Sequence, residues 1–172
     1  AASDLNYVIL RYFNVAGADP QARIGQSTPK ATHLIKVATE TALGQRDGMA
    51  VFGTDYPTED GTCIRDYIHV EDLASAHLAG LDYLQKGGES TILNCGYGHG
   101  ASVTEVIETV KRVSGVDFPV KLKPRRAGDP AQLISDNSKI LATLDWKPQY
   151  DDLEFIVKTA YAWQQKCVEL EQ

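Results

Sequence analysis

The sequence predicts an α/β fold, in which parallel strands buried on both faces alternate with amphipathic helices. The segment Tyr7-Val8-Ile9-Leu10-Arg11-Tyr12 is a nearly continuous apolar run, which is typical of a parallel strand covered on both faces. The segments 32–46 and 103–114 instead carry apolar residues at helical spacing. With 172 residues and 43% hydrophobic content, the chain is long enough to bury one good core, or one domain and part of another.

Composition excludes several classes of function. The formal net charge of −6 argues against a nucleic-acid or membrane-surface partner, because both require clustered Lys and Arg. No apolar run approaches the roughly 18 residues of a transmembrane helix, and no signal-peptide pattern opens the chain. The three cysteines, Cys63, Cys95 and Cys167, are widely spaced, which predicts a reducing, cytoplasmic location and neither a disulfide framework nor a metal site.

The beginning of the chain suggests that the sequence is a fragment or a processed half of a longer protein. It opens with Ala1 rather than methionine and enters the first strand within a few residues. A buried parallel strand needs neighbours on both sides, and no segment precedes this one to supply them. The alternative is a chain that has lost only its initiator and a short tag.

Polar and aromatic residues follow the first strand at the place where a ligand is expected. The strand ends at Tyr12-Phe13-Asn14, and ligands of open α/β sheets bind at the carboxyl ends of strands. The polar loop 21–30 is long enough to cover a ligand. A helix over 32–46, with His33 in its first turn, and a short strand over 49–53 complete this region.

The segment 55–74 packs a turn, a strand and a helix start into twenty residues. Alternation over the strand 63–70 places Cys63, Arg65, Tyr67 and His69 on one face. Arg65 needs a partner, either a neighbouring carboxylate or a phosphate, and on this residue alone the carboxylate is the preferred interpretation. Acidic residues at 71–72 then open a helix to position 85, whose expected buried residues are Leu73, Ala76, Leu81 and Leu84.

A glycine motif at 96–101 matches a dinucleotide-binding fingerprint, with Asp117 about twenty residues further on. Two features count against that interpretation. Ser102-Val103-Thr104-Glu105 is a capping box, so the next helix has a side-chain cap of its own and starts late. Asp117 also precedes the strand 119–123, whereas a ribose-binding acid follows one. We therefore expect an ordinary turn here.

The last third of the chain predicts three helices and a basic turn. A helix over 103–114 stops at Gly115, a short helix covers 138–144, and the final helix opens with the acids at 151–154. Pro124-Arg125-Arg126-Ala127-Gly128-Asp129 follows a strand. Two adjacent arginines form either a solvated basic turn or, together with Arg65, a second fork for a diphosphate.

Three of these segments resemble one family. D-Y-P-T-E-D-G-T-x-x-R-D-Y-I-H-V-x-D-L-A over 55–74, L-R-Y-F-N-V-A-G-A over 10–18 and P-R-R-A-G-D over 124–129 are similar to the UDP-glucose (UDP-galactose) 4-epimerases of the extended short-chain dehydrogenase/reductase group. The resemblance covers nearly the whole chain, but only the second half of such an enzyme. It implies the last strands of a Rossmann-type parallel sheet, over residues 1–20, and a smaller α/β substrate domain that makes up most of 21–172, with some segments returning to the Rossmann domain.

The resemblance also implies the roles of individual residues. Tyr12 and Phe13 would lie at the NAD cofactor, and the UDP-hexose would be bound by Asn14, His33, Leu34, Ala50, Val51, Phe52, Arg65, Arg126, Asp129 and Leu133. Ala50 to Phe52 would frame the uracil. Arg126 would bind the diphosphate, and Asp129 would bind the ribose hydroxyls. Related epimerases usually carry Asn where this chain has His33, so its hydrogen bond would come from a different place.

The chemistry of that family requires residues that this sequence does not contain. In the family, NAD is held on a glycine-rich βα turn and takes a hydride from the sugar, giving a 4-keto intermediate, while the tyrosinate of a Tyr-x-x-x-Lys pair takes the proton. No tyrosine in this chain is followed four positions later by lysine. The resemblance thus implies no catalytic residue here, a missing N-terminal half as partner, and a homodimer for the intact enzyme.

Two other functions stay open at this point. One is a sister NAD-dependent sugar-nucleotide dehydratase, which the segment D-Y-P-T-E-D-G-T makes less favourable. The other is a non-catalytic nucleotide-sugar-binding module. Within the epimerase interpretation, Leu133 occupies the position that walls the pocket beside the 2-position of the sugar, which predicts a preference for UDP-glucose and UDP-galactose over their N-acetyl forms.

Overall fold

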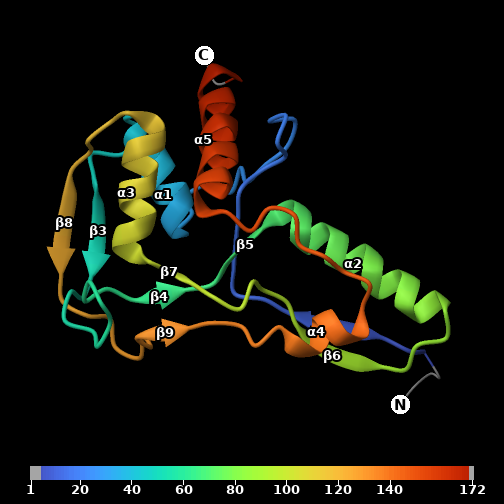
Figure 1. Ribbon diagram of the computed structural model, residues 1–172. Helices are drawn as coiled ribbons and strands as arrows, with labels where there is room; N and C mark the ends of the chain where they lie inside the picture. The colour runs from blue at the N-terminus through green and yellow to red at the C-terminus, as the bar shows by residue number, and fades with distance from the viewer. Residues whose placement is uncertain (1–4, 171–172) are drawn as a thin grey trace.

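The computed structural model describes residues 5–170 (Figure 1). The first expected domain, 1–20, thus lacks a description of residues 1–4, and the second, 21–172, lacks one of residues 171–172. The strands are β1 (Val8–Arg11), β2 (Asn14–Ala16), β3 (Met49–Phe52), β4 (Ile64–Arg65), β5 (Tyr67–His69), β6 (Thr91–Asn94), β7 (Ala101–Ser102), β8 (Val120–Lys123) and β9 (Gln132–Leu133). The helices are α1 (Leu34–Ala42), α2 (Val70–Gln85), α3 (Val103–Ser114), α4 (Ser138–Thr143) and α5 (Leu153–Leu170).

The strands form small sheets that are mostly parallel, which agrees with the predicted α/β class. β1 pairs with β6, β2 with β5 and β3 with β8, in each case in parallel. A further sheet has β4 at its centre, antiparallel to β7 and parallel to β9. Parallel partners far apart in sequence require crossover connections, and helices supply them here.

The helices gather in two places (Figure 1). α1, α3 and α5 pack against one another beside β3 and β8, whereas α2 runs along β1, β2 and β5, and α4 lies against β6. One apolar core joins both parts, with Ile68, Leu93, Val106, Ile140 and Ile156 among its fully buried side chains. Within residues 5–170, none of these helices combines the length and the apolar character that crossing a membrane would need.

The predicted capping box of α3 is confirmed, and the glycine turn before it serves packing. Ser102 Oγ accepts from the Glu105 N–H at 3.0 Å, and Glu105 Oε2 accepts from the Ser102 N–H at 2.7 Å. Gly115 ends the helix with φ of 72°. A Cβ at Gly96 would lie 2.5 Å from Asp66 Oδ2, so glycine is needed there for the close approach of a carboxylate within the chain.

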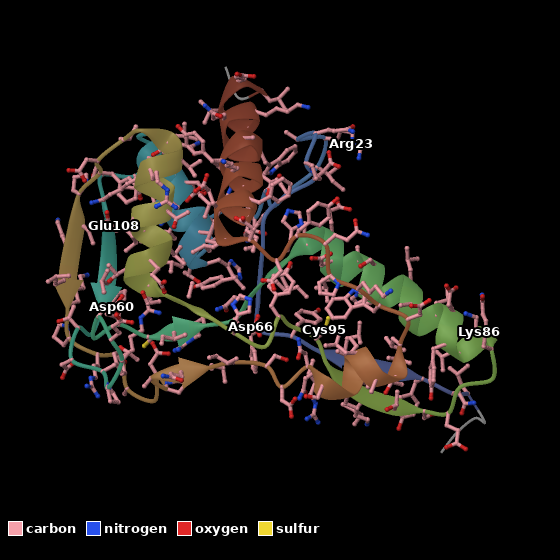
Figure 2. All side chains as sticks on the ribbon, viewed as in Figure 1. Arg23, Asp60, Asp66, Lys86, Cys95 and Glu108 are labelled. Atoms are coloured by element: carbon pink, nitrogen blue, oxygen red, sulfur yellow. The ribbon has the colours of Figure 1, made fainter. Side chains whose placement is uncertain are left out.

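The prediction of one continuous strand over Cys63 to Val70 is wrong, because the chain breaks at Asp66. This side chain is buried in the middle of the molecule (Figure 2), and its carboxylate accepts backbone N–H groups of Tyr97, Gly98 and Ser135 at 3.1–3.2 Å. A buried carboxylate is tolerated only when its oxygens have donors, and these three amides satisfy it. β4 and β5 consequently join different sheets.

The first strand is not buried on both faces by the residues that the structure describes. Val8 packs close to Gly80 of α2, but Ile9 is 45% exposed and Tyr7 is 50% exposed. The reason is that α2 covers one face of β1, and β6 is its one neighbouring strand within residues 5–170. Leu81 was also expected to be buried, but it lies on the outer face of α2 and is 52% exposed.

Candidate functional site

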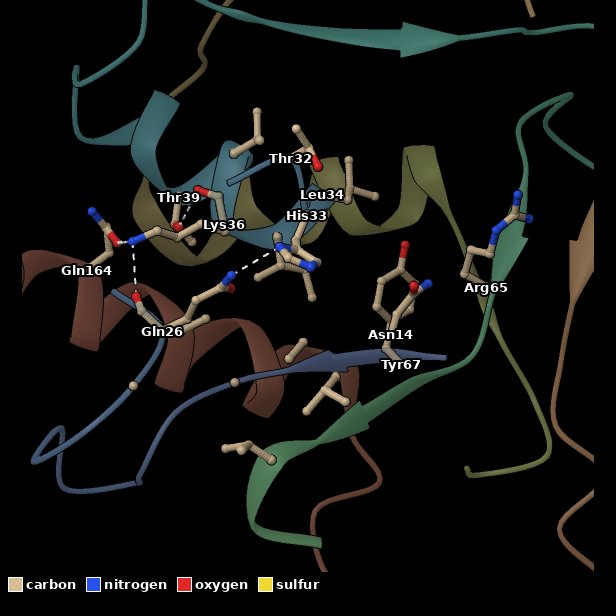
Figure 3. A pocket seen from close by; sticks show the side chains of 18 of the residues that line it. Asn14, Gln26, Thr32, His33, Leu34, Lys36, Thr39, Arg65, Tyr67 and Gln164 are labelled. Carbon is tan, nitrogen blue, oxygen red and sulfur yellow. Dashed lines mark hydrogen bonds between the residues drawn. The ribbon is translucent and has the colours of Figure 1, made fainter. Parts of the chain in front are cut away.

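A cavity of about 790 Å³ lies beside β2, the strand that follows β1, and below α1 in the view of Figure 3. Its volume falls within the range of small-molecule sites, roughly 300–1,000 Å³. The structure brings most of the predicted substrate residues together in its wall: Asn14, His33, Leu34, Ala50, Phe52, Arg65, Arg126 and Asp129. The loop after β2 and the helix α5 contribute further parts of the wall, including Ile24, Gln26 and Trp163.

Arg65 is paired with a carboxylate in the cavity wall. Its Nη2 lies 2.7 Å from Asp129 Oδ1, and its Nη1 donates to the Ile64 carbonyl oxygen at 2.8 Å. The side chain of Arg65 is 13% exposed and that of Asp129 is 31% exposed. The preferred interpretation of Arg65 alone, a neighbouring carboxylate, therefore describes its position in this structure.

The adjacent arginines of the basic turn point to different places. The Arg126 guanidinium lies over the ring of Phe52, 3.7 Å from its centroid, and both residues line the cavity. Arg125 instead lies over Tyr56 at 4.1 Å and pairs with Asp55 at 2.6 Å, outside the cavity. Such cation–π contacts leave the N–H groups at the edge of a guanidinium available to an anion.

The edge of β3 that faces away from β8 offers backbone groups. Met49 and Gly53 donate their N–H groups toward the β8 side, to Pro119 and Lys123. Since successive amides of a strand point in opposite directions, the N–H and C=O groups of Ala50 and Phe52 face the other edge, which has no strand partner among residues 5–170. Val51 does not line the cavity, because its side chain is 4% exposed and belongs to the core.

Tyr67 lines the cavity and was not predicted as a site residue. It is the register partner of Asn14 across β2 and β5, and both side chains project into the cavity (Figure 3). Burial raises the pKa of Tyr67, so its hydroxyl stays protonated and able to donate. The signal for Tyr67 was present in the sequence, since strand alternation placed it on the same face as Cys63 and Arg65, and all three line the cavity.

The far end of the cavity contains polar residues that the sequence did not identify. Lys36 is nearly buried, donates to the Gln26 carbonyl oxygen at 3.1 Å and to Gln164, and pairs with Glu40 at 3.4 Å. Asp19 is buried beside this end, and hydrogen bonds from Arg23 hold the pKa of its carboxyl well below the usual range. Lys36 owes its place to partners on other elements, which the sequence does not show, whereas Asp19 is held by Arg23, four positions further on in the same loop.

Besides Val51, three more predicted site residues lie outside the cavity. Tyr12 and Phe13, proposed for the cofactor, sit at the end of β1 and are 47% and 42% exposed. Leu133 lies in β9 opposite Arg65 and is half-buried. Any ligand contact of these side chains therefore lies beyond the cavity wall. Within residues 5–170, no group of three or more His, Cys, Asp or Glu side chains is placed to hold a metal ion.

The wall as a whole suits a nucleotide diphosphate. It combines the two guanidinium groups of Arg65 and Arg126 with the aromatic ring of Phe52. The phenol of Tyr67 and the amide of Asn14 can donate hydrogen bonds, and one edge of β3 has no strand partner within residues 5–170. A guanidinium matches the geometry of phosphate oxygens, and an aromatic ring offers a face for a base.

The chain is similar to known epimerases in sequence and in structure. The model of the NAD dependent epimerase/dehydratase family matches residues 1–96. Over 164 residues the chain is 57% identical to a UDP-glucose 4-epimerase of Azospirillum brasilense, covering 95% of this chain and 47% of that protein. The chain spans about half the length of the curated relatives it matches.

Solved structures agree with this similarity. A crystal structure of a UDP-glucose 4-epimerase superposes with a TM-score of 0.93 at 50% identity, covering 96% of this chain and 50% of that one. The UDP-Glc/GlcNAc 4-epimerase of Campylobacter jejuni is 62% identical, with a TM-score of 0.80, over 94% of this chain and 49% of that one.

Proposed function

The chain belongs to the NAD dependent epimerase/dehydratase family, and on that basis we propose that it supplies the UDP-sugar-binding half of a UDP-glucose 4-epimerase. The observation that carries this proposal is the cavity wall, where residues from separate segments of the chain meet Arg65, Arg126 and Phe52. Each of these residue types suits one part of a nucleoside diphosphate sugar. The similarity of almost the whole chain to UDP-glucose 4-epimerases supports the same assignment.

In this proposal the uracil lies at the edge of β3. The backbone groups of Ala50 and Phe52 face the side away from β8 and would pair with the polar edge of the base, while the Phe52 ring supplies apolar surface. The side chain of Val51 points into the core, so this residue would contribute only by keeping the backbone of Ala50 and Phe52 in strand geometry. Leu34 and His33 line the adjoining wall.

The diphosphate would lie between Arg65 and Arg126, with the ribose hydroxyls at Asp129. A diphosphate carries about two negative charges, and two guanidinium groups balance them better than one. Asp129 holds Arg65 at 2.7 Å in this structure, so a bound phosphate would share or replace the carboxylate as partner of the guanidinium. Asn14 and Tyr67 would face the sugar side with an amide and a protonated hydroxyl.

The cofactor of this family is NAD, which supplies the hydride acceptor and donor when bound. Among residues 5–170, the exposed rings of Tyr12 and Phe13, which follow β1, would contact the cofactor. The sequence contains no Tyr-x-x-x-Lys pair, so the catalytic base and the cradle for the rest of NAD would come from an N-terminal half. The exposed face of β1 is where that half would pack.

The proposed division of the chain follows from this arrangement. Residues 1–20 would complete the NAD-binding domain, and most of 21–172 would form the substrate domain, with β5, α2 and β6 returning to the first. The intact enzyme would be a cytoplasmic homodimer acting in galactose metabolism. A reducing location agrees with the free thiols of Cys63, Cys95 and Cys167.

The test compares the chain by itself with the intact enzyme. Calorimetry should detect UDP binding to the intact enzyme, and a coupled assay with UDP-galactose and NAD should detect turnover there but none with the 172 residues by themselves. Turnover by the isolated chain would refute the division of labour. Formation of a 4-keto-6-deoxy product would identify a dehydratase, and UDP binding without any turnover by the intact protein would identify a binding module.

A further inference from the structure

Gln26, in the loop after β2, contacts one of the proposed substrate residues. Its Nε2 lies 3.0 Å from His33 Nδ1, and both residues line the cavity (Figure 3). The sequence-based interpretation treated the segment 21–30 only as a covering loop. The contact makes one of its side chains part of the wall.

The chemistry of this contact determines which nitrogen of His33 carries the proton. A glutamine Nε2 only donates hydrogen bonds, so His33 Nδ1 accepts. In the neutral imidazole the proton then resides on Nε2, which is a donor. The Nε2 of His33 has no partner among residues 5–170, so this donor is available in the cavity wall.

His69, which also stands at a helix N-cap, has a partner for each of its two ring nitrogens. Both residues are N-caps with the same extended backbone, φ −67° and ψ 133° for His33 and φ −66° and ψ 138° for His69. His69 Nδ1 accepts from the Glu71 N–H at 3.1 Å, and its Nε2 lies 3.1 Å from Thr159 Oγ1. His33 makes no capping bond with its side chain, so its ring is oriented by Gln26 instead.

The backbone of Gln26 is held by two helices. Its carbonyl oxygen accepts from Lys36 Nζ of α1 and from Trp163 Nε1 of α5, each at 3.1 Å. The preceding Gly25 packs closely against the indole of Trp163. A Cβ at this position would lie 2.4 Å from Trp163 Cδ1, so the close approach requires glycine. These contacts fix the loop and leave the Gln26 side chain free to reach His33.

We propose that Gln26 is a positioning residue, which holds the imidazole of His33 so that its Nε2–H donates to an acceptor oxygen of the nucleoside diphosphate in the cavity. The inference rests on the proposed function for the identity of the ligand. It assigns to a loop glutamine the role of orienting a donor that the ligand meets. Lys36 and Trp163 act one step further away, through the backbone of Gln26.

The test is a double-mutant cycle on UDP affinity in the intact enzyme, measured by calorimetry. Gln26→Ala should weaken UDP binding by about 3- to 10-fold in the parent, the effect of one oriented hydrogen bond, and should have no effect in a His33→Ala background. Gln21→Ala is the matched control, since Gln21 is an exposed glutamine of the same loop outside the cavity. Equal weakening in both backgrounds, or none in the parent, would overturn the proposal.

A second measurement needs no ligand. The ¹⁵N resonance of His33 Nδ1, assigned by its loss in His33→Ala, should move in Gln26→Ala and stay in place in Gln21→Ala, because only the first variant removes the donor. An unmoved resonance in Gln26→Ala would refute the contact. Failure of the parent to bind UDP would count against the proposed function, and the NMR result would still decide whether Gln26 orients His33.

Discussion

Arg65 and Asp129 stand 64 positions apart in the chain and form an ion pair of 2.7 Å in the wall of the cavity. The sequence-based interpretation gave them to different parts of one ligand, the diphosphate and the ribose. Each of the two side chains has an oppositely charged partner in the cavity wall. When a diphosphate binds, Arg65 therefore exchanges one charge-assisted contact for another. The net gain in binding free energy is smaller than the sum over the new contacts.

Arg65→Ala or Arg126→Ala in the intact enzyme should weaken UDP binding by about one to two powers of ten. Each guanidinium contributes a charge-assisted contact to the diphosphate worth roughly 1.5–3 kcal/mol. Calorimetric titration with UDP measures the effect. Arg125→Ala is the matched control, because Arg125 is bound to Asp55 outside the cavity and its loss should leave UDP affinity unchanged. Parent-like affinity in either test variant would show that this arginine does not contact the diphosphate.

Asp72→Ala should destabilise the fold by about 3 kcal/mol or more. The Asp72 carboxylate is 1% exposed and accepts from Tyr97 Oη at 2.7 Å and from the N–H groups of Gln149 and Tyr150 at 2.8 Å. Removing it leaves one buried and two partly buried donors without their charged acceptor, and a hydrogen bond to a charged group contributes about 1.5–3 kcal/mol. Urea unfolding measures the change. Asp82→Ala, on the exposed side of the same helix, should stay within about 0.5 kcal/mol of the parent, and a similar loss in both would argue against this reason.

The stability of the protein should fall as the pH drops below about 6.5, in part because of His69. Burial lowers the pKa of this imidazole, and the nearby Asp72 only partly offsets that effect. A group with a lowered folded-state pKa contributes stability that is present above its unfolded pKa, about 6.5 for histidine, and that is lost as the pH falls. Protonation would also remove the acceptor that caps α2, since His69 Nδ1 receives the Glu71 N–H.

Urea unfolding between pH 8 and pH 5 tests this role of His69. His69→Asn keeps an N-cap residue but does not titrate, so its loss of stability over this range should be smaller than in the parent. His99→Asn, which replaces an exposed imidazole, should retain the full loss. An identical pH dependence in the parent and in His69→Asn would exclude His69 as the cause.

In the intact enzyme, Leu133→Tyr should abolish the turnover of N-acetylated UDP-sugars, which we expect to be weak in the parent. Leucine leaves more room than tyrosine beside the 2-position of the sugar, but an acetamido group there would lack hydrogen-bond partners at a cost of about 1–3 kcal/mol. kcat/KM for UDP-glucose and for UDP-N-acetylglucosamine, in both proteins, measures the preference. Equal use of both substrates by the parent would contradict the expected preference, and it would match the name of the 62% identical Campylobacter jejuni enzyme. Unchanged N-acetyl turnover in the variant would show that Leu133 does not face the sugar.

Local elements could be predicted from the sequence because their signals lie within a few neighbouring residues. The helix α3 is an example, since Ser102 and Glu105 cap its start, apolar residues recur at helical spacing, and Gly115 ends it. The same holds for the strands β3 and β8, whose parallel pairing agrees with the predicted α/β class. The family could also be recognised, because three long motifs agree in residue type and order.

Only the tertiary structure decided how these elements divide and which side chains meet. The break at Asp66 depends on N–H groups of residues 97, 98 and 135, and the exposure of Ile9 and Leu81 depends on which faces α2 covers. Asp129 as partner of Arg65 likewise comes from the packing of segments 64 positions apart. Gln26 lies only seven positions from His33, but Lys36 of α1 and Trp163 of α5 hold its backbone in place. The sequence by itself therefore determined the local periodicity and the family, because these are properties of adjacent residues. Contacts between distant residues set the hydrogen bonds and charges of the cavity, because a buried polar group takes its partner from whichever element the fold places beside it.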